Sequence, residues 1–367
     1  MLVIRGVFGL QLSGELVLVS CSVLLCSDPS TCFLCLLPEP PMTEAALNAS
    51  LDVAQTSLTL EGLRQLSAHR LILFPFLLLA FVFALCSDSL VLLVICARRG
   101  LHRPMFVFVA ALLLNSALGS STIYPRLLWE LLWEDGSVRV TLSACVGQAW
   151  VIYSLGAASF LLLAAMAFDR YVAICLPLRY AALLSPRAVA AALLCCWLIP
   201  AVLVGGAVLI AARAPHCRAQ INRLYCDVYS LIRLGCGGNA AKLGEFFALF
   251  TFTATVLLPA AFVIFSYSCI FFVCLCRARA SSGKALRTCL PHLLVFLNYS
   301  ACSVAEVLWR RLQAAHQPAS SVLISLLVVL VPSVLNPVVY GLNMDAITAP
   351  LRRLLGRVAH REAPGKV

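Results

Sequence analysis

Long apolar runs alternate with short basic segments along most of this chain. Seven runs reach the length of about 20 residues that a helix needs to cross the hydrocarbon core of a bilayer. Because lipid offers no partner for an unpaired backbone amide, such runs predict helices. We expect helices at residues 71–97, 104–127, 143–174, 188–212, 245–276, 286–309 and 319–342. The pattern therefore predicts an all-α membrane protein built as a bundle of seven transmembrane helices.

The composition supports this fold class. Of the 367 residues, 62% are hydrophobic and only 12% are charged, whereas an ordinary soluble domain has about 25% charged residues. These values exclude a water-soluble enzyme and also a disordered chain, which is polar and highly charged. In so apolar a chain we attribute the net charge of +11 to loops beside the membrane, and we expect membrane lipids as partners and no nucleic acid.

The basic residues predict how the chain is oriented. Short loops and span ends rich in basic residues tend to face the cytoplasm, and Arg98, Arg99 and Arg103 crowd the short segment after the first run. We therefore expect a multi-pass protein of the plasma membrane with its N-terminus outside and its C-terminus in the cytoplasm. Asn48 begins an Asn-Ala-Ser glycosylation sequon before the first span, which would then lie outside.

The segments that flank the seven spans divide into three parts. Residues 1–41 hold an apolar run that Glu15 interrupts, and no small-residue cleavage site follows. They are either a cleaved leader or an artefact of start-site choice, and we expect no folded domain there. Residues 42–70 would form an extracellular tail, 71–342 the seven-helix domain, and 343–367 a cytoplasmic tail with a short amphipathic eighth helix lying on the inner membrane face.

One charged pair stands inside the third apolar run. The string "MAFDRYVAICLPLRY" (166–180) places Asp169 and Arg170 near the end of that run. Ionisable groups within a membrane span are costly unless they are paired or face a cavity, so they are candidates for function. The alternative for a lone arginine is that its side chain reaches out to lipid phosphate.

At this string the sequence resembles the olfactory receptors, a branch of the rhodopsin-like G-protein-coupled receptors. Four further strings agree in order and spacing: "LHRPMFVF" (101–108), "SYSCI" (266–270), "KALRTCLPHLLVF" (284–296) and "PSVLNPVVYGLN" (332–343). The resemblance runs from about residue 70 to 358. Pro259 and the loop string "YCDVYSLIRLGC" (225–236) are more similar to fish odorant receptors than to mammalian ones.

The resemblance implies a switch around the charged pair. Arg170 would pair with Asp169 at rest and separate on activation, which exposes a cleft for a heterotrimeric G protein of the stimulatory class and raises cyclic AMP. Tyr171 would pack below the pair, and the hydroxyls of Tyr267 and Tyr340 would swing toward Arg170. The alternative for each tyrosine is an aromatic anchor at the membrane interface.

Three residues of the sixth and seventh spans complete the implied switch. Pro337 removes a backbone donor and would bend the seventh helix, and Asn336 would satisfy the freed carbonyls or bridge to the second span. His292 is either a titratable latch on the sixth span or a structural histidine bonded to a carbonyl.

Cysteines in polar segments are candidates for disulfides. Cys145 would lie at the outer end of the third span, and Cys217, Cys226 and Cys236 lie in the second extracellular loop. Four cysteines permit three pairings, and the sequence alone does not choose among them. The resemblance implies that Cys145 pairs with Cys226 and Cys217 with Cys236. The competing interpretation is a zinc site that includes His216, but we expect no metal and no cofactor.

Helical spacing back from Arg170, Pro259 and His292 predicts a pocket between spans three, five and six. Its predicted lining is mostly apolar with a few hydroxyls and suits a small, weakly polar ligand such as an odorant; the alternative at each position is plain helix packing. The predicted lining residues are Ile152, Tyr153, Gly156, Ala157, Phe160, Thr251, Phe252, Thr255, Ser300, Ser303, Val304 and Val307. Glu306 and Arg310 would instead suit a charged, water-borne solute.

Polar residues also occur at similar depths in other spans. Asp88, Asn115 and Asn336 would all lie near the midplane and could share one hydrated cluster. Whether a sodium ion binds near Asp88 stays open.

The leading hypothesis is an odorant receptor that is not an enzyme. The alternatives are a non-olfactory rhodopsin-like receptor for another small ligand and a polytopic transporter, for which the chain shows no inverted repeat. An amine receptor of the usual kind would have an acid in the outer part of span three, where Ile152 and Tyr153 stand.

Overall fold

The computed structural model describes residues 2–12, 15–25, 57–62, 70–132, 138–276, 282–312, 318–343 and 348. The predicted glycosylation site at Asn48 and the predicted amphipathic helix within 343–367 fall outside the described residues, apart from positions 343 and 348.

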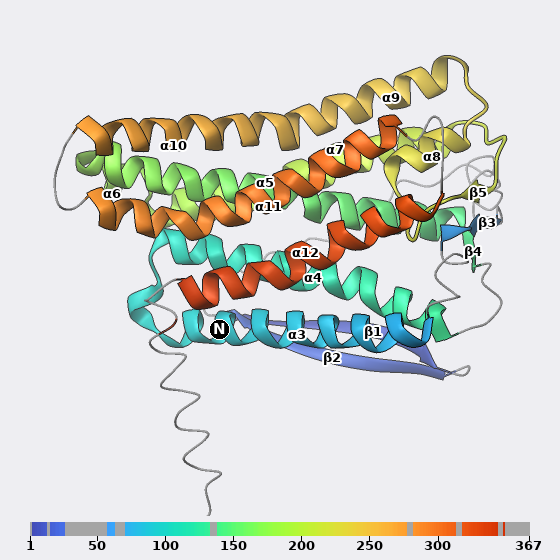
Figure 1. Ribbon diagram of the computed structural model, residues 1–367, viewed down its shortest axis with the longest axis horizontal. Coiled ribbons are helices and arrows are strands. Elements are labelled where there is room, and N and C mark those ends of the chain that lie inside the picture. Colours follow the sequence, from blue (N-terminus) through green and yellow to red (C-terminus); the bar gives the residue numbers. More distant parts are fainter. Residues whose placement is uncertain are drawn as a thin grey trace, which may run out of the picture.

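Seven long helices account for most of the described chain, as Figure 1 shows. Each contains a stretch that is long and apolar enough to cross a membrane, which confirms the predicted fold class. They are α3 (Arg70–Ala97), α4 (Pro104–Leu132), α5 (Leu142–Cys175), α7 (Pro186–Arg213), the continuous α9–η4–α10 (Gly238–Cys276), α11 (Ser282–Leu312) and α12 (Pro318–Asn343).

Side-chain caps mark where two of these helices begin. The hydroxyl of Thr141 accepts a hydrogen bond from the Ala144 amide at 3.3 Å at the start of α5, and Ser185 accepts from the Ala188 amide at 3.4 Å at the start of α7. Such caps satisfy amides that have no partner within the first helical turn. Pro186 follows Ser185 at the first helical position, where its missing N–H costs nothing.

The fifth span extends further than its apolar run and contains a π-helical turn. It begins at Gly238, before Lys242 and Glu245, because a helix can continue into water beyond the apolar stretch that the sequence marks. The π-helical turn η4 (Thr253–Leu257) lies between α9 (Gly238–Phe252) and α10 (Leu258–Cys276). Pro259 has no N–H to donate to the carbonyl of Thr255, so the regular helical ladder is interrupted there.

Helix α5 lies at the centre of the bundle. It contacts α4, α7, α10 and α11, and Figure 1 shows it between α10 and α4. Leu162, Leu163, Met166 and Ala167 on this helix are all buried in the apolar core. Side chains on α5 can therefore contact residues of four neighbouring spans.

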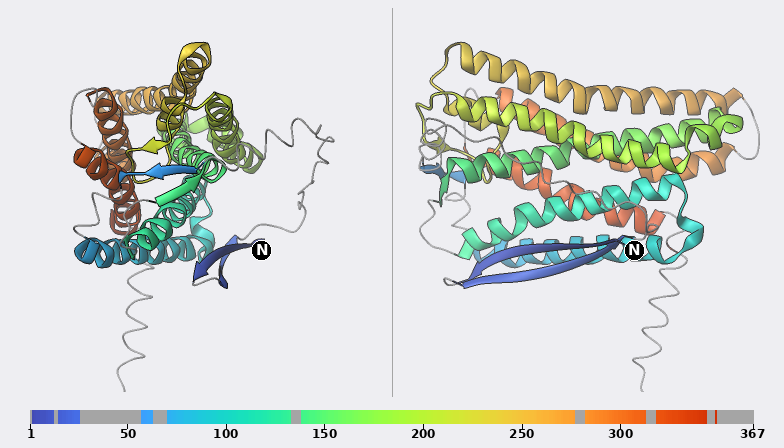
Figure 2. Two further views of the ribbon diagram at one scale, coloured as in Figure 1. Left: turned by 90° about the vertical axis from the view of Figure 1, so that its right-hand side faces the viewer. Right: turned by 180° about the vertical axis from the view of Figure 1, so that it is seen from behind.

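A small sheet lies at one end of the bundle. Its central strand β3 (Ser57–Leu60) pairs antiparallel with β4 (Val138–Thr141) and parallel with β5 (Gln220–Ile221). Figure 2 (left) faces this end, where the three strands lie side by side. The short helix α8 (Val228–Leu234) follows β5. We call this end, which also carries both disulfides, the disulfide end.

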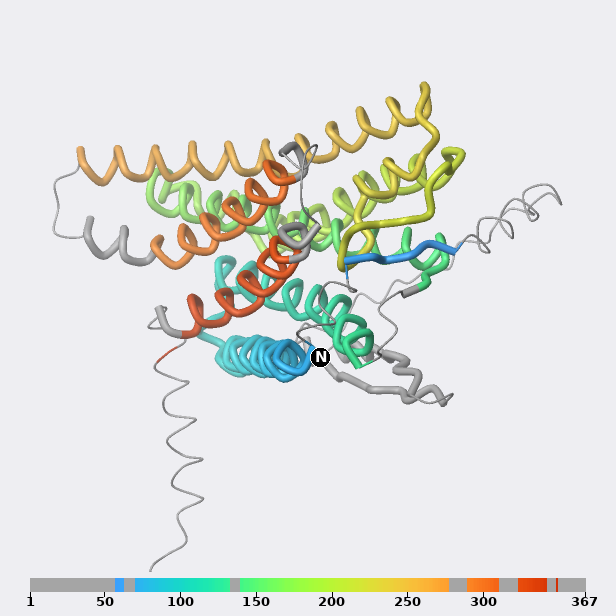
Figure 3. Tube along the Cα trace, turned by 45° about the vertical axis from the view of Figure 1, so that its right-hand side comes forward, coloured from blue at the N-terminus to red at the C-terminus, as the bar shows by residue number. Residues whose placement is uncertain are grey.

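The other end carries the short helical segments η2 (Arg99–Leu101), η3 (Pro177–Arg179) and α6 (Tyr180–Leu183). We call it the Asp169 end. Figure 3 shows the long helices running between the two ends.

Residues near the N-terminus form a hairpin that the sequence analysis did not predict. Strand β1 (Leu2–Leu12) pairs antiparallel with β2 (Glu15–Leu25), with Leu2 opposite Leu25. A two-stranded hairpin is marginally stable on its own in water. Both interpretations of residues 1–41, a leader or a start-site artefact, stay predictions.

Candidate functional site

A cavity of about 730 Å³ opens inside the bundle toward the disulfide end. This volume lies within the usual range for small-ligand sites. Its wall is mostly apolar, with hydroxyl and amide groups contributed by several helices. The arrangement can enclose a small organic molecule and offer it a few directional hydrogen bonds.

The predicted residues of spans three and five all line this cavity: Ile152, Tyr153, Gly156, Ala157, Phe160, Thr251, Phe252 and Thr255. The π-helical turn η4 helps to place Thr255, which is buried and donates to the carbonyl of Thr251 at 2.8 Å. That these residues bind a ligand stays a prediction.

The predicted face of span six requires a correction. Ser303 and Val307 line the cavity, but Ser300 and Val304 do not, and Val304 is 56% exposed on the outside of the bundle. At about 100° per residue, position 304 points about 120° away from His292, the residue from which the face was counted. The face that lines the cavity instead includes Tyr299, Cys302 and Glu306.

Spans two and seven also contribute to the wall, which the prediction confined to spans three, five and six. Asn115, Ser116 and Ser120 come from α4, and Ser333 comes from α12. The hydroxyls of Ser333 and Tyr124 lie 2.9 Å apart and link these two helices beside the cavity.

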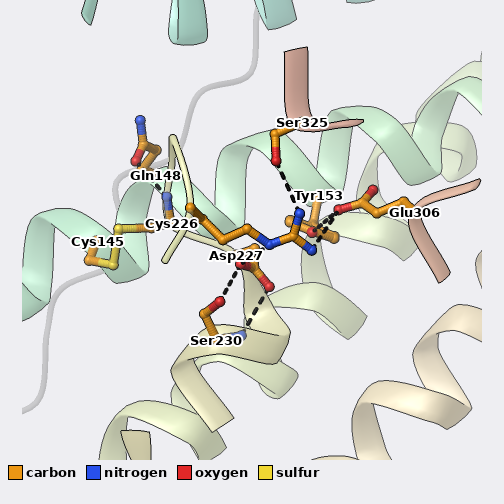
Figure 4. A network of polar contacts seen from close by, with 9 residues as sticks. Cys145, Gln148, Tyr153, Cys226, Asp227, Ser230, Glu306 and Ser325 are labelled. Atoms are coloured by element: carbon orange, nitrogen blue, oxygen red, sulfur yellow. Dashed lines mark hydrogen bonds and ion pairs between the residues drawn. A yellow bond between two sulfur atoms is a disulfide. The ribbon is translucent and has the colours of Figure 1, made fainter. Parts of the chain in front are cut away.

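A buried arginine from the loop before α8 contacts residues beside the cavity at the disulfide end; Figure 4 labels its partners Asp227, Glu306 and Ser325. Arg223 is 6% exposed, and its Nη1 donates to Ser325 Oγ on α12 at 3.0 Å. Its Nε lies 3.7 Å from Asp227 Oδ2, and its Nη2 lies 4.0 Å from Glu306 Oε1 on α11. The hydroxyl of Tyr153 on α5 donates to the same Glu306 oxygen at 3.2 Å. We call Arg223, Asp227, Glu306, Ser325 and Tyr153 the outer network.

Arg223 was not predicted as a site residue. A single arginine in a polar loop carries no local signal that separates it from the exposed arginines nearby, and only its tertiary burial marks it. Glu306 was considered, but only as a recognition group for a charged solute.

Two disulfides hold the loop that carries Arg223. Cys145 pairs with Cys226, and Cys217 pairs with Cys236. This is the pairing that the resemblance implied, and it engages all four thiols that the competing zinc site would need. Burial lowers the pKa of nearby His216 below its ordinary value.

Further hydrogen bonds fix the same loop. The Gln148 side chain accepts from the Cys226 amide at 3.1 Å, and Asp227 caps α8 by accepting from the Ser230 amide at 2.9 Å. Figure 4 shows these contacts beside the Cys145–Cys226 bridge. These contacts hold the segment that directly follows Arg223.

At the Asp169 end the predicted charged pair is formed. Arg170 Nη2 lies 3.4 Å from Asp169 Oδ2, and the hydroxyl of Tyr180 donates to Asp169 Oδ1 at 2.8 Å. Burial, then the hydrogen bond to Asp169 and its negative charge, raise the pKa of Tyr180 to about 12. Tyr180 was not predicted as a site residue, although it closes the string that identified the pair.

His292 connects three helices near this pair. Its Nε2 lies 3.0 Å from the carbonyl oxygen of Leu163 on α5, and its Nδ1 lies 2.7 Å from the hydroxyl of Tyr267 on α10. Because a carbonyl can only accept, Nε2 donates, and the neutral ring's Nδ1 accepts from Tyr267. His292 therefore has the carbonyl contact of the structural interpretation, and its role as a titratable latch stays a prediction.

The other predicted switch residues lie on the same helices. The ring of Tyr171 faces Phe265, with centroids 6.5 Å apart. Tyr340 is fully buried, and its hydroxyl has no hydrogen-bond partner among the described residues. Pro337 lies within the continuous helix α12, and the preceding Asn336 donates to the hydroxyl of Tyr299 at 2.9 Å.

The hydrated cluster predicted for Asp88, Asn115 and Asn336 stays a prediction. Asn115 donates to the Leu155 carbonyl and to Ser159, and accepts from the indole of Trp197, so its amide is used by α5 and α7. No hydrogen bond joins it to Asp88 or Asn336, both of which are buried.

Comparison with known proteins identifies the family. A protein-family model described as "Olfactory receptor" matches residues 77–357. Human Olfactory receptor 10AC1 is 35% identical over 314 residues, which cover 83% of this chain and 94% of that protein. Human Olfactory receptor 2AG2 is 32% identical over 281 residues, which cover 76% of this chain and 86% of that protein.

Human Olfactory receptor 6S1 is 31% identical over 309 residues, covering 83% of this chain and 91% of that protein. The similarity of the loop string 225–236 to fish receptors stays a prediction beside these human relatives. The matches cover nearly all of the seven apolar helices, and they show that this multi-pass membrane protein belongs to the olfactory receptor family of G-protein-coupled receptors, which are not enzymes.

Proposed function

We propose that this protein is an odorant receptor of the plasma membrane, which binds a small extracellular ligand and activates a stimulatory heterotrimeric G protein, raising cyclic AMP. The observation that carries the proposal is the cavity of about 730 Å³ at the disulfide end. Its wall includes parts of α5 and α11, the two helices that also carry Arg170 and His292 at the opposite end. A ligand in the cavity therefore contacts the helices that the switch would have to move.

Two arguments support placing the disulfide end outside the cell. Disulfides persist in oxidising compartments such as the extracellular space, and both disulfides lie at this end. The basic residues Arg98, Arg99 and Arg103 surround η2 at the opposite end, where the positive-inside tendency favours the cytoplasm. The N-terminus would then be outside and the C-terminal tail beyond residue 343 inside, next to lipid.

Activation in this proposal is a shift between two arrangements of α11. The hydrogen bond that His292 donates to the Leu163 carbonyl and the one it accepts from Tyr267 hold α11 against α5 and α10 in the resting arrangement. A ligand that binds better to the arrangement with α11 displaced shifts the population toward it by its difference in affinity. Arg170, Tyr267 and Tyr340 would then rearrange around the opened site for the G protein.

A cellular assay tests this function. The chain is expressed with a stimulatory G protein, and cyclic AMP is measured against a panel of odorants and amino acids. We expect at least one ligand to raise cyclic AMP, Arg170→Ala to abolish that response, and Arg187→Ala, a control at an exposed arginine, to retain it. A response that Arg170→Ala leaves unchanged at matched surface expression would contradict the proposed switch.

The transporter alternative loses support from the family assignment. A rhodopsin-like receptor for a non-odorant ligand would use the same cavity and the same switch, and the ligand panel separates it from an odorant receptor.

A further inference from the structure

The outer network presents only some of its groups to the cavity. Tyr153 and Glu306 line the cavity wall, whereas Arg223, Asp227 and Ser325 lie behind them and do not. A ligand in the cavity therefore meets a carboxylate acceptor and a hydroxyl before it meets the guanidinium. A group that donates hydrogen bonds and carries positive charge matches that surface best.

Glu306 is the most shielded of the charged residues that line the cavity among the described residues. The others, Arg233, Lys242 and Glu245, are exposed at the mouth, and the guanidinium of Arg233 lies over the ring of Tyr229 at 4.9 Å. The Glu306 side chain is only 15% exposed. Water and salt screen exposed charges strongly and buried ones much less, so Glu306 has the largest influence on a ligand's charged group among the charged residues that line the cavity.

Glu306 can turn toward a ligand without leaving Arg223 unpaired. The separation of 4.0 Å between Arg223 Nη2 and Glu306 Oε1 is an ion pair and too long for a hydrogen bond. Arg223 keeps its hydrogen bond to Ser325 and its ion pair with Asp227 in either case. A carboxylate ligand would instead meet the Glu306 charge first and be repelled.

The wall around Glu306 suits an aliphatic body. Val307 and Cys302 line the cavity on the same helix, and Ile152 and Phe160 line it from α5. Apolar atoms of a ligand can be removed from water there, beside the Glu306 carboxylate that accepts from the hydroxyl of Tyr153.

We propose that Glu306 is the ligand-anchoring residue of this receptor and that the cavity takes small primary amines with an apolar body, the ammonium binding to the Glu306 carboxylate. This inference rests on the proposed receptor function and adds to it the class of ligand. The anchoring acid then lies on span six. An amine receptor of the usual kind was expected to carry its acid on span three.

Three probes of equal chain length test the inference: hexylamine, hexanol and hexanoate. Each is applied to the full-length receptor in the cyclic AMP assay, and to purified receptor in a thermal unfolding assay that reports binding without a G protein. We expect hexylamine to act at a concentration about tenfold or more below that of hexanol, as one charge-assisted contact of about 1.4 kcal/mol would give, and hexanoate to act least.

Variants at the anchor give the decisive comparison. Glu306→Gln should remove the preference for hexylamine over hexanol, while Glu306→Asp, which keeps the charge, should retain much of it. Tyr153→Phe should reduce the preference by a smaller factor. The matched control Glu245→Gln removes an exposed carboxylate at the same cavity and should leave the preference intact. Surface expression of each variant separates loss of binding from loss of folding.

The two assays separate failure of this inference from failure of the proposed function. Equal action of hexylamine and hexanol, a stronger action of hexanoate, or a preference unchanged in Glu306→Gln would overturn the amine inference and leave the receptor function standing. Stabilisation by hexylamine that depends on Glu306 but raises no cyclic AMP would support the amine site and count against the stimulatory coupling. No stabilisation by hexylamine would overturn the inference.

Discussion

Arg223 at the disulfide end contacts side chains from its own loop, from α11 and from α12, whereas Arg170 at the Asp169 end contacts the carboxylate next to it in sequence. The first arginine ties separate parts of the fold together, and the second pair lies within one helix. Releasing the Arg170 pair therefore frees a side chain without separating any helices, which suits a switch. Breaking the contacts of Arg223 would separate its loop from α11 and α12, so this arginine suits a structural role.

Helix α11 is tied to α5 at both ends, but by different chemistry. At the disulfide end the contact is the charged one from Tyr153 to Glu306, and at the Asp169 end it is the neutral one from His292 to the Leu163 carbonyl. Hydrogen bonds to a charged group are stronger than neutral ones. In the proposed mechanism, a ligand that binds to Glu306 weakens the stronger contact between α11 and α5, and the weaker contact of His292 with Leu163 then breaks as α11 moves.

The largest expected effect on stability comes from removing the disulfides at the disulfide end. Removing Cys145–Cys226 by double serine substitution should lower the free energy of unfolding by about 2–5 kcal/mol. The bridge spans 81 residues, whereas Cys217–Cys236 spans 19, and loop-closure entropy makes the shorter bridge worth about 1 kcal/mol less. Thermal unfolding in detergent measures both variants. Equal losses would show that the entropy of the long loop does not decide the stability of the disulfide end.

Glycine substitutions probe the packing of each end. A Cβ at Gly62 would lie 2.5 Å from the backbone of Arg223, so Gly62→Ala must shift the loop and should cost about 1–3 kcal/mol. The control Gly100→Ala, at the Asp169 end, meets open space and should cost little. Thermal unfolding compares the pair, and hydrogen exchange in the loop of residues 220–227 locates the effect. Equal melting temperatures of the two variants would mean that Gly62 is not in close steric contact with the backbone of Arg223.

The smallest effect is expected at Tyr180. Tyr180→Phe removes a hydrogen bond to a carboxylate and should cost about 1.5 kcal/mol, the low end for a charged partner, because Tyr180 is only partly buried. The pKa of Tyr180 is raised to about 12 in the folded protein, so the unfolded chain loses the proton at lower pH. The hydroxyl's contribution is therefore fully present below about pH 10 and is lost as pH rises through about 12.

Thermal unfolding of wild type and Tyr180→Phe as a function of pH measures this contribution. The difference between them should vanish at the alkaline end. A difference that grows with pH would contradict the assigned donor, because Tyr180 can donate to Asp169 only while it keeps its proton.

The fold could be predicted from the sequence more completely than the site. Apolar runs report the energetics of burial in lipid directly, so all seven helices were found. The largest difference is at the start of the fifth, whose first turns are polar. The pairing of Cys145 and Cys226 came from resemblance to a family. No pattern in the loop itself distinguished it from the other possible pairings.

The features that escaped prediction depend on rotation and tertiary contact. Val304 was placed on the wrong face because its position, about 120° from His292 at ideal helical spacing, does not belong to that face, whereas Ser303 and Val307 do. Arg223 and Tyr180 act through partners that other segments supply, and no local pattern in their neighbourhood marks them. Their burial and hydrogen bonds exist only after the helices have packed.

The central claim is that the cavity at the disulfide end controls the arrangement of α11 at the Asp169 end. Spin-labelled unnatural amino acids at the exposed positions Leu178, beside α5, and Leu290, on α11, leave the native cysteines untouched. Pulsed electron resonance then measures the distance between them, without ligand and with the six-carbon probe that most stabilises the receptor. We predict that saturating probe shifts the distribution to longer distances. Superimposable distributions with and without saturating probe would contradict the account.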